Sequence, residues 1–439
     1  MSHASGPGHP TVIVGGGLTG ISAALHAGRP YLLFEREETL GGLARTEERD
    51  GFYFDRTGHW LHLRDPGIKA LAERVLGPEL AEVERKARVY SHGALTLYPF
   101  QANLHGLPPE VVYECLLGLF NAQLRRGATE PRNFEQYVLY HFGEGIARHF
   151  MVPYNAKLWG VHPREITSAW CSRFVPLPSV EQVLAGALGV GPSELGYNVR
   201  FRYPRKGGIE TFTRALVAEL DPTRVHLRSR VEAIDPAART VRVDGETVRY
   251  HALIPSLPLP RLVELLVEPP REVEEAAARL RATSLVYLNV ATRRPCPVDY
   301  HWVYVPEERF PFYRVGVFSN AMPSMAPPGC ASYYVELSTR EVGPDPAAMV
   351  ADAVRALVEV KAIASPDDVL FADVRRIDPA YVVFDELYES SVGTIQRYLE
   401  GQRIFSRGRY GAWIYNAMED SLLAGRGAAE AAAALPAEG

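Results

Sequence analysis

Residues 11–20 read Thr-Val-Ile-Val-Gly-Gly-Gly-Leu-Thr-Gly, and this stretch decides the fold of the 439-residue chain. Residues 12–14 are expected to form a buried parallel strand, and residues 21–27 to open a helix. Between them, Gly15, Gly17 and Gly20 give the pattern G-x-G-x-x-G. Such glycines let the backbone approach a pyrophosphate closely, and the unpaired N–H groups of a helix N-terminus favour an anion. The stretch therefore predicts a bound dinucleotide.

A second strand and a second glycine pair follow. Residues 31–34 read as a strand, and Glu35 at its carboxyl end is placed to accept hydrogen bonds from a ribose diol. Gly41 and Gly42 come next, and a strand-like run over residues 52–55 leads to Gly58 and His59. This order resembles the FAD-binding fold of the superfamily that contains amine oxidases, phytoene desaturases and UDP-galactopyranose mutases. FAD is therefore the expected cofactor.

The composition is ordinary for a globular protein, with 47% hydrophobic and 23% charged residues. A net charge of -5 offers no basic excess for a nucleic-acid partner. The four cysteines are scattered without metal-ligand spacing, so we expect free thiols and no metal site. No apolar run is long enough to span a bilayer and no signal region is visible, so we expect a cytoplasmic protein.

The chain changes its pattern along its length. Residues 108–160 carry helical periodicity and are expected to form an inserted group of helices. Short strands over residues 224–255, with a hairpin turn at Asp244, are expected to rejoin the first sheet. Residues 284–377 read mostly as strands, interrupted by a loop over 322–329 and a helix over 346–361. Asp65 and Asp345 are placed as helix N-caps, and residues 419–434 are expected to form a closing helix.

These segments predict an α/β fold with a Rossmann-like FAD-binding domain, an inserted helical domain and a mostly antiparallel β-sheet domain. The FAD-binding domain is expected to be discontinuous, over residues 1–90, 205–265 and 390–439. The helical domain, expected to bind the substrate, covers residues 103–200. The sheet domain covers residues 266–389 together with 91–102.

Three aromatic clusters narrow the resemblance. The first joins Tyr-Pro-Phe-Gln at residues 98–101 to Phe-Met-Val-Pro-Tyr-Asn-Ala-Lys-Leu-Trp at 150–159. The second is Pro-Phe-Tyr-Arg-Val-Gly-Val-Phe-Ser-Asn at 311–320, and the third is Ile-Phe-Ser-Arg-Gly-Arg-Tyr-Gly-Ala-Trp-Ile-Tyr at 404–415. In this order and at these separations, the chain resembles the UDP-galactopyranose mutase family over residues 11–425, and its eukaryotic-type members most.

The resemblance implies two groups of substrate contacts. A uridine pocket would be formed by Tyr98, Phe100, Gln101, Phe150, Asn155 and Trp159. The diphosphate would be held by Arg314 and Arg409, with hydrogen bonds from Tyr304, Tyr381 and Tyr415. The residue types suit these roles, because aromatic faces stack on a base, amides pair with its edge and guanidinium groups bind phosphate oxygens. The residues alone also allow a core role for the aromatic side chains and a carboxylate partner for each arginine.

The resemblance also implies where FAD is held. The contacts would come from Gly15, Gly17, Leu18, Thr19, Gly20, Glu35, Arg36, Gly42, Leu43, Ala44, Gly58, His59, Val231, Met418 and Glu419. His59 would lie beside the isoalloxazine ring and tune its surroundings. Thr57 stands where the family usually has glycine, and a β-branched residue restricts a backbone flip after flavin reduction. Phe174 stands where an arginine near the flavin is common, with Arg173 one position earlier.

The implied reaction interconverts the pyranose and furanose forms of a UDP-sugar, UDP-galactopyranose and UDP-galactofuranose or a related sugar. In this family N5 of the reduced flavin attacks the anomeric carbon while UDP leaves. Arg314 and Arg409 would stabilise the departing charge, and His59 completes the expected catalytic set. NADPH is a candidate reductant. The sequence leaves the sugar, the nucleobase, the reductant and the oligomeric state open.

Two other functions fit the sequence. One is an FAD-dependent amine oxidase or desaturase, which removes hydride from its substrate and has no need of paired arginines. The other is a catalytically silent flavoprotein that binds a nucleotide sugar, which the departures at Thr57 and Phe174 would explain.

Overall fold

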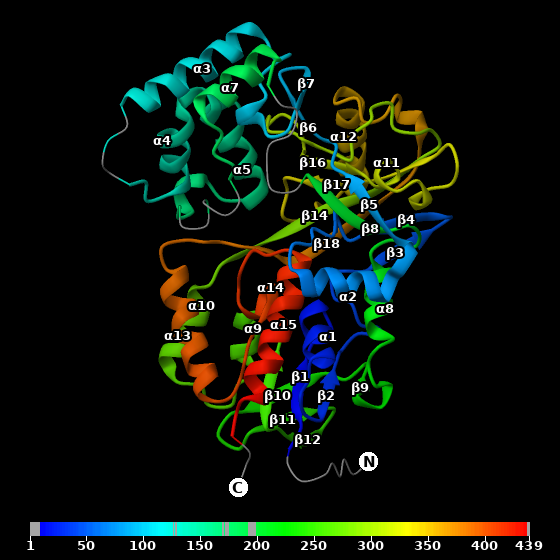
Figure 1. The fold of residues 1–439 in the computed structure, drawn as a ribbon, viewed down its shortest axis with the longest axis vertical. Coiled ribbons are helices and arrows are strands. Elements are labelled where there is room, and N and C mark those ends of the chain that lie inside the picture. The colour runs from blue at the N-terminus through cyan, green and yellow to red at the C-terminus, as the bar shows by residue number, and fades with distance from the viewer. Residues whose placement is uncertain are drawn as a thin grey trace.

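The computed structural model describes residues 9–125, 127, 130–168, 171, 175–191 and 199–436. Figure 1 shows a lower body that holds the first and last helices of the chain. A group of helices stands at the upper left, and a sheet with its covering helix stands at the upper right. The mixed α/β fold that the sequence predicts is confirmed.

The lower body is built on a four-stranded parallel sheet with strand order β13-β1-β2-β9. β1 (Thr11–Val14) lies between β2 (Tyr31–Phe34) and β13 (Ala252–Pro255), so the end of the late block of strands rejoins the first sheet as expected. The strands within residues 231–249 of that block form a separate three-stranded sheet instead. β9 (Val225–His226) pairs with β2 at the edge. All residues of β1 are buried, which is typical of a parallel strand that is covered on both faces.

Two helices from distant parts of the sequence pack together beside this sheet (Figure 1). α1 (Leu18–Leu25) begins earlier than the predicted residue 21, because Gly17 already serves as its N-cap. α15 (Met418–Ala433) corresponds to the predicted closing helix. Ser22 donates a hydrogen bond of 2.6 Å to the carbonyl oxygen of Leu422. A Cβ atom on Gly425 would collide with the backbone of α1, so glycine permits the close contact.

The seven-stranded sheet has the order β18-β14-β17-β16-β15-β6-β7 and is antiparallel except where β6 pairs with β15. Its strands are β6 (Ala87–Ser91), β7 (Ala94–Leu97), β14 (Ala282–Thr292), β15 (Trp302–Tyr304), β16 (Phe312–Val317), β17 (Ala331–Leu337) and β18 (Val369–Val382). β6 therefore places residues 87–91 in this sheet. α12 (Pro346–Glu359) packs against the strands through a shared buried cluster.

The inserted helices are α3 (Pro109–Leu124), α4 (Phe134–Ile146), α5 (Val152–Trp159) and α7 (Val180–Leu188). A π-helical turn over Ala147–Met151 joins α4 to α5, and the predicted inserted group of helices is confirmed. In the ranges that the structure describes, no helix has the length and apolarity to cross a bilayer.

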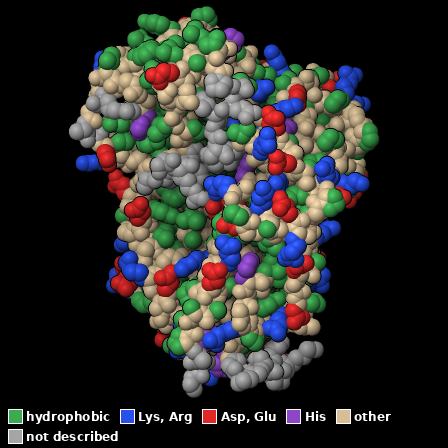
Figure 2. All heavy atoms as spheres, viewed as in Figure 1, with side chains coloured by type: hydrophobic (Ala, Val, Ile, Leu, Met, Phe, Trp, Pro, Cys, Tyr) green, Lys and Arg blue, Asp and Glu red, His purple; other side chains and the backbone are tan. Residues whose placement is uncertain are grey.

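One side of α3 carries a stripe of exposed apolar side chains. Tyr113, Leu117, Phe120 and Leu124 are 65%, 44%, 38% and 85% exposed. Their spacing of four, three and four residues places them on one helix face. Figure 2 shows hydrophobic side chains at the top of the molecule, where Figure 1 places α3.

The remaining elements connect these regions. They are β3 (Thr46–Arg49), β4 (Phe52–Asp55), α2 (Pro66–Leu76), β5 (Leu80–Glu84), β8 (Arg200–Pro204), α8 (Glu210–Val217), β10 (Val231–Asp235), β11 (Thr240–Val243), β12 (Glu246–Arg249), α9 (Leu259–Glu264), α10 (Arg271–Arg279), α11 (Phe318–Ala321), α13 (Tyr388–Gly401) and α14 (Gly408–Gly411). The predicted hairpin turn lies between β11 and β12. Asp65 and Asp345 cap α2 and α12 through their side chains, as predicted. The predicted loop over 322–329 contains one short helical turn, Pro323–Met325.

Candidate active site

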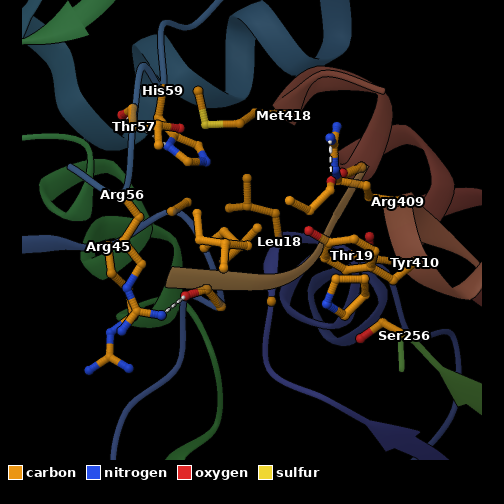
Figure 3. Close-up of a pocket in the computed structure, with 18 of the residues that line it drawn as sticks. Leu18, Thr19, Arg45, Arg56, Thr57, His59, Ser256, Arg409, Tyr410 and Met418 are labelled. Atoms are coloured by element: carbon orange, nitrogen blue, oxygen red, sulfur yellow. Dashed lines mark hydrogen bonds between the residues drawn. The ribbon is translucent and has the colours of Figure 1, made fainter. Parts of the chain in front are cut away.

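A cavity of about 1180 Å³ lies where the carboxyl edge of the parallel sheet meets the seven-stranded sheet. Val14 and Phe34 line it from the parallel sheet, and Leu285 and Arg314 line it from the antiparallel sheet. Figure 3 shows part of its wall. The volume exceeds the roughly 300–1,000 Å³ of sites that hold one drug-sized ligand. The cavity therefore has room for a cofactor and a substrate together.

The glycine turn forms one end of the cavity. Gly15 has a φ of 99°, which glycine adopts without strain. Residues 15–19 line the cavity, and no side chain caps the first turn of α1, so its N–H groups are left for an anion. Glu35 also lines this end and accepts a hydrogen bond of 2.6 Å from the Gly16 amide. A diphosphate beside a ribose fits this combination of donors and carboxylate.

Most of the residues expected to hold FAD lie in the wall of this cavity. They are Gly15, Gly17, Leu18, Thr19, Glu35, Arg36, Gly42, Leu43, Ala44, Gly58, His59, Val231 and Met418. Gly20 lies behind the wall, where a Cβ would collide with the carbonyl oxygen of Gly15. Glu419 also lies outside, because its carboxylate accepts hydrogen bonds of 2.5 and 2.7 Å from the amides of Arg64 and Asp65. Gly20 thus permits the close approach of two backbone segments, and Glu419 links α15 to the start of α2 through hydrogen bonds.

Two of the buried polar atoms in the wall that lack a hydrogen-bond partner from the described part of the protein lie in the segment between α14 and α15. They are the buried Nε1 of Trp413 and the buried Oδ1 of Asn416. A buried donor or acceptor that stays unpaired costs about 1–3 kcal/mol, so such atoms point to a polar ligand. Both precede the N-terminus of α15, where Ala417 and Met418 also line the cavity. The wall therefore suits a ligand with hydrogen-bonding edges, such as a flavin.

The Thr57 and His59 loop enters the cavity from β4. Thr57 has a φ of 68°, in the left-handed region that β-branched residues strongly avoid. Nδ1 of His59 lies 3.4 Å from the carbonyl oxygen of Thr57. Burial and, to a smaller extent, the charge of Arg409 lower the pKa of His59 to about 4, against a backbone hydrogen bond with Thr57 that raises it. His59 is therefore neutral near pH 7.

Arg314 lies on β16 and reaches the cavity wall. Its Nε and Nη2 donate hydrogen bonds of 2.6 Å to the two carboxylate oxygens of Glu336. Glu336 is fully buried on the adjacent strand β17. The carboxylate partner that the sequence left open therefore exists for Arg314, and the ion pair has no net charge.

Arg409 lies on α14 and is held in a different way. Its two terminal nitrogens donate hydrogen bonds to the carbonyl oxygens of Asn416 at 2.9 Å and Ala380 at 3.0 Å. The guanidinium also lies 5.0 Å from the ring centre of Tyr415. No carboxylate of the described residues forms an ion pair with it. Carbonyl oxygens fix its position without cancelling its charge, so Arg409 keeps a positive charge in the cavity.

Four of the expected substrate-binding tyrosines line the cavity with these arginines. They are Tyr98, Tyr304, Tyr381 and Tyr415. The rings of Tyr98 and Tyr304 lie 4.8 Å apart. Burial raises the pKa of Tyr304 and of Tyr381, so both phenols stay protonated and can donate hydrogen bonds. The structure thus brings Arg314, Arg409 and these phenols into one cavity.

The other five residues of the expected uridine pocket do not line the cavity. They are Phe100, Gln101, Phe150, Asn155 and Trp159, and all five are buried. The Phe100 and Phe150 rings stack on each other at 5.0 Å. Gln101 donates to the carbonyl oxygen of Pro176 at 3.0 Å, and Asn155 accepts from Trp159 at 3.3 Å. In this structure the five side chains therefore pack in the hydrophobic core, which is the alternative that the sequence left open. Phe174 and Arg173 lie outside the described residues.

Sequence reasoning missed several residues of the wall. Arg45 and Arg56 line the cavity, as do Tyr287 and Arg375 from the antiparallel sheet. Glu336 was also missed, although a glutamate inside the buried run of β17 is a signal that a cation lies nearby. The arginines gave no such signal, because isolated arginines in a sequence are most often solvated.

Comparisons with known proteins agree with this architecture. The chain matches the model of flavin containing amine oxidoreductases over residues 18–432. A zeta-carotene-forming phytoene desaturase from Myxococcus xanthus is 26% identical over 404 aligned positions, and the match covers 78% of this chain and 74% of that protein. A solved structure of reduced UDP-galactopyranose mutase is 27% identical with a TM-score of 0.91, and the match covers 96% of this chain and 93% of that one.

The resemblance to UDP-galactopyranose mutase that the aromatic clusters indicated is thus confirmed at the level of the whole fold. The family model extends from the first turn of α1 almost to the end of α15, and so includes both sides of the cavity. The chain belongs to the flavin containing amine oxidoreductase family, and this membership implies FAD as its cofactor.

Proposed function

We propose that this protein is a flavin-dependent nucleotide-sugar mutase that interconverts the pyranose and furanose forms of a UDP-sugar, such as UDP-galactose. The position of Arg409 carries this proposal. A guanidinium that two carbonyl oxygens hold, and that no described carboxylate neutralises, is suited to a diphosphate. Amine and hydrocarbon substrates offer no anion for such a group. The likeness to the mutase structure gives further support.

Reduced FAD, when bound, supplies the nucleophilic electron pair for this reaction. The protein then has to hold the sugar diphosphate and stabilise the charge that develops as UDP leaves. Arg409 is the main source of that stabilisation, and the Arg314–Glu336 pair offers its remaining N–H groups without net charge. Donors placed in a cavity that excludes water stabilise a developing anion more than donors in solvent.

The phenols and His59 have orienting roles in this proposal. Tyr304 and Tyr381 stay protonated and donate hydrogen bonds to phosphate oxygens. His59 stays neutral, so it orients its neighbours without adding a second positive charge beside Arg409. Binding of a uracil by the expected pocket requires the Phe100 and Phe150 rings to separate, whereas Tyr98 and Tyr304 already face the cavity.

The test uses the purified FAD-loaded protein under anaerobic conditions. The protein is reduced with dithionite or NADPH and incubated with a panel of UDP-hexoses and UDP-pentoses, and furanose products are followed by NMR. We expect conversion only by the reduced protein, without consumption of an oxidant. Arg409→Gln should lose most of the turnover while it keeps its flavin absorbance. Arg271→Gln, a control at an exposed arginine, should behave as the parent. Absence of any furanose product across the panel would refute the proposal.

A second candidate is the dehydrogenation of an apolar or amine substrate. The packing of five expected uridine-binding residues in the core and the likeness to a phytoene desaturase favour it. A dehydrogenase bleaches its own oxidised flavin when substrate is mixed in without oxygen. A mutase leaves oxidised flavin unchanged on mixing with its sugar. Stopped-flow absorbance with both substrate classes therefore separates the two candidates.

A further inference from the structure

A second pair of arginines lies across the cavity from Arg409. Arg45 and Arg56 flank the hairpin of β3 and β4, and the Arg56 amide donates a hydrogen bond of 3.3 Å to the Arg45 carbonyl oxygen. Figure 3 shows both side chains on the side of the cavity opposite Arg409. Like charges on facing strand positions destabilise a hairpin. The repulsion between the two arginine charges therefore destabilises the hairpin unless an anion binds to them.

No carboxylate among the described residues pairs with either arginine. The Arg56 guanidinium donates to the carbonyl oxygen of Gly42 at 3.4 Å, and no described residue forms a hydrogen bond or an ion pair with the Arg45 side chain. The nearest acid in sequence, Asp55, faces inward, where it accepts hydrogen bonds from Tyr203 at 2.5 Å and Thr46 at 2.7 Å.

Two acids of the cavity wall, one on β3 and one on β18, are engaged with other arginines. Glu47 pairs with Arg375 at 2.9 Å, and Asp378 pairs with Arg376 at 3.2 Å. Neither carboxylate is therefore left for Arg45 or Arg56. Two uncompensated positive charges in one wall attract an anion from the cavity, because a guanidinium in a partly enclosed site is stabilised by a charge-assisted hydrogen bond.

We propose that Arg45 and Arg56 form a phosphate-binding site in the cavity wall, separate from the arginines on the opposite side. The planar guanidinium group matches phosphate oxygens in pairs. The position of Gly42 supports a phosphate as the anion, because Gly42 packs against Gly17 at the N-terminus of α1. The site thus adjoins the anion-binding turn. The phosphate comes either from the diphosphate of FAD or from a second phosphorylated ligand. The site does not depend on the mutase reaction.

The test uses Arg45→Gln, Arg56→Gln and the double variant. Arg49→Gln is the matched control, because Arg49 lies on the same hairpin and pairs with Asp373 at 2.7 Å. Thermal unfolding of the FAD-free proteins comes first. Because two facing like charges are removed, the double variant should be at least as stable as the parent. If the double variant does not purify as a folded protein, the two single variants replace it in the binding measurements.

Two binding measurements distinguish the sources of the phosphate. The first is the Kd of the FAD-free protein for FAD. The second is the Kd of the FAD-loaded protein for inorganic pyrophosphate and for NADPH. We expect the double variant to raise Kd about ten- to hundredfold in at least one measurement. A rise in the first identifies FAD as the source, and a rise in the second identifies another ligand. If neither Kd changes more than in Arg49→Gln, the site does not exist.

Discussion

Arg314 and Glu336 face each other across β16 and β17 and join in a bidentate pair, with both N···O distances at 2.6 Å. The pair sits in the wall of a cavity whose other expected diphosphate-binding arginine, Arg409, is held by carbonyl oxygens. The two arginines therefore contribute unequally to the electrostatic potential of the site. One is neutralised within the protein, and the other retains its charge.

This inequality predicts the effect of charge removal on UDP binding. The double variant Arg314→Gln/Glu336→Gln removes two opposite charges and should change the Kd for UDP little. Arg409→Gln removes an uncompensated charge and should raise that Kd about tenfold or more. Isothermal titration of the FAD-loaded proteins with UDP measures both. Equal weakening in the two variants would contradict the proposed division between the arginines.

Glu336→Gln alone should destabilise the protein. The substitution leaves the Arg314 charge without its partner, and breaking a buried pair costs about 3–5 kcal/mol. We expect about 3 kcal/mol, the lower end of that range, because Arg314 keeps contact with the cavity. Urea unfolding measures the loss. Glu275→Gln breaks an exposed pair with Arg271 and should cost under about 1 kcal/mol. A loss for Glu336→Gln as small as this control would show that the pair adds little.

Thr57→Gly should not weaken the fold, although most substitutions by glycine do. The left-handed φ of 68° costs a β-branched residue about 1–2 kcal/mol, and glycine removes that cost. Its greater freedom in the unfolded chain offsets about 0.5–1 kcal/mol of the gain. The free energy of unfolding should therefore stay level or rise by up to about 1.5 kcal/mol. Thr240→Gly, in the regular strand β11, should lower it. Equal losses at both positions would rule out strain at Thr57.

Asp55 gives a pH dependence whose sign follows from its surroundings. Burial raises its pKa from 3.8 to about 7, against hydrogen bonds from Tyr203 and Thr46 that lower it. The folded protein thus binds this proton more tightly than the unfolded chain. The contribution of Asp55 to stability is full below about pH 3.8 and is lost as the pH rises through about 7.

Asp55→Asn should remove that dependence, because the amide keeps the hydrogen-bonding shape without titrating. Below about pH 7, the parent should lose up to about 1.4 kcal/mol of stability relative to this variant for each unit by which the pH rises. Urea unfolding of both proteins from pH 5 to pH 8 measures the difference, and histidines cancel in the comparison. Parallel stability curves for the two proteins would show that Asp55 does not titrate in this range.

Local signals in the sequence predicted much of the fold. Gly15 and Glu35 predict the dinucleotide-binding turn, because both belong to the turn and to the strand beside it. Asp65 and Asp345 predict the starts of their helices for the same reason. The side chain of an N-cap residue accepts a hydrogen bond from the backbone N–H three positions ahead. The sequence pattern places the start of α1 too late, because Gly17 fits the glycine turn as well as the N-cap position that it occupies.

The candidate site was less predictable because it depends on register and long-range packing. Which residue neutralises Arg314 depends on the alignment of β16 with β17, and no local pattern sets that alignment. An aromatic ring that stacks on a base and one that stacks on another ring look alike in a sequence, as Phe100 and Phe150 illustrate. Arg45 and Arg56 meet only because their hairpin folds.

The contact between α1 and α15 sets an order of events during synthesis. Ser22 bonds to Leu422, and 400 positions separate them in the chain. At roughly 5–20 residues per second, a ribosome needs about 20–80 s to travel that far. The glycine turn therefore leaves the ribosome long before Met418, which lines the same cavity, has been made. The cavity is therefore incomplete until α15 has been made, and a nascent chain that stops before α15 should be colourless.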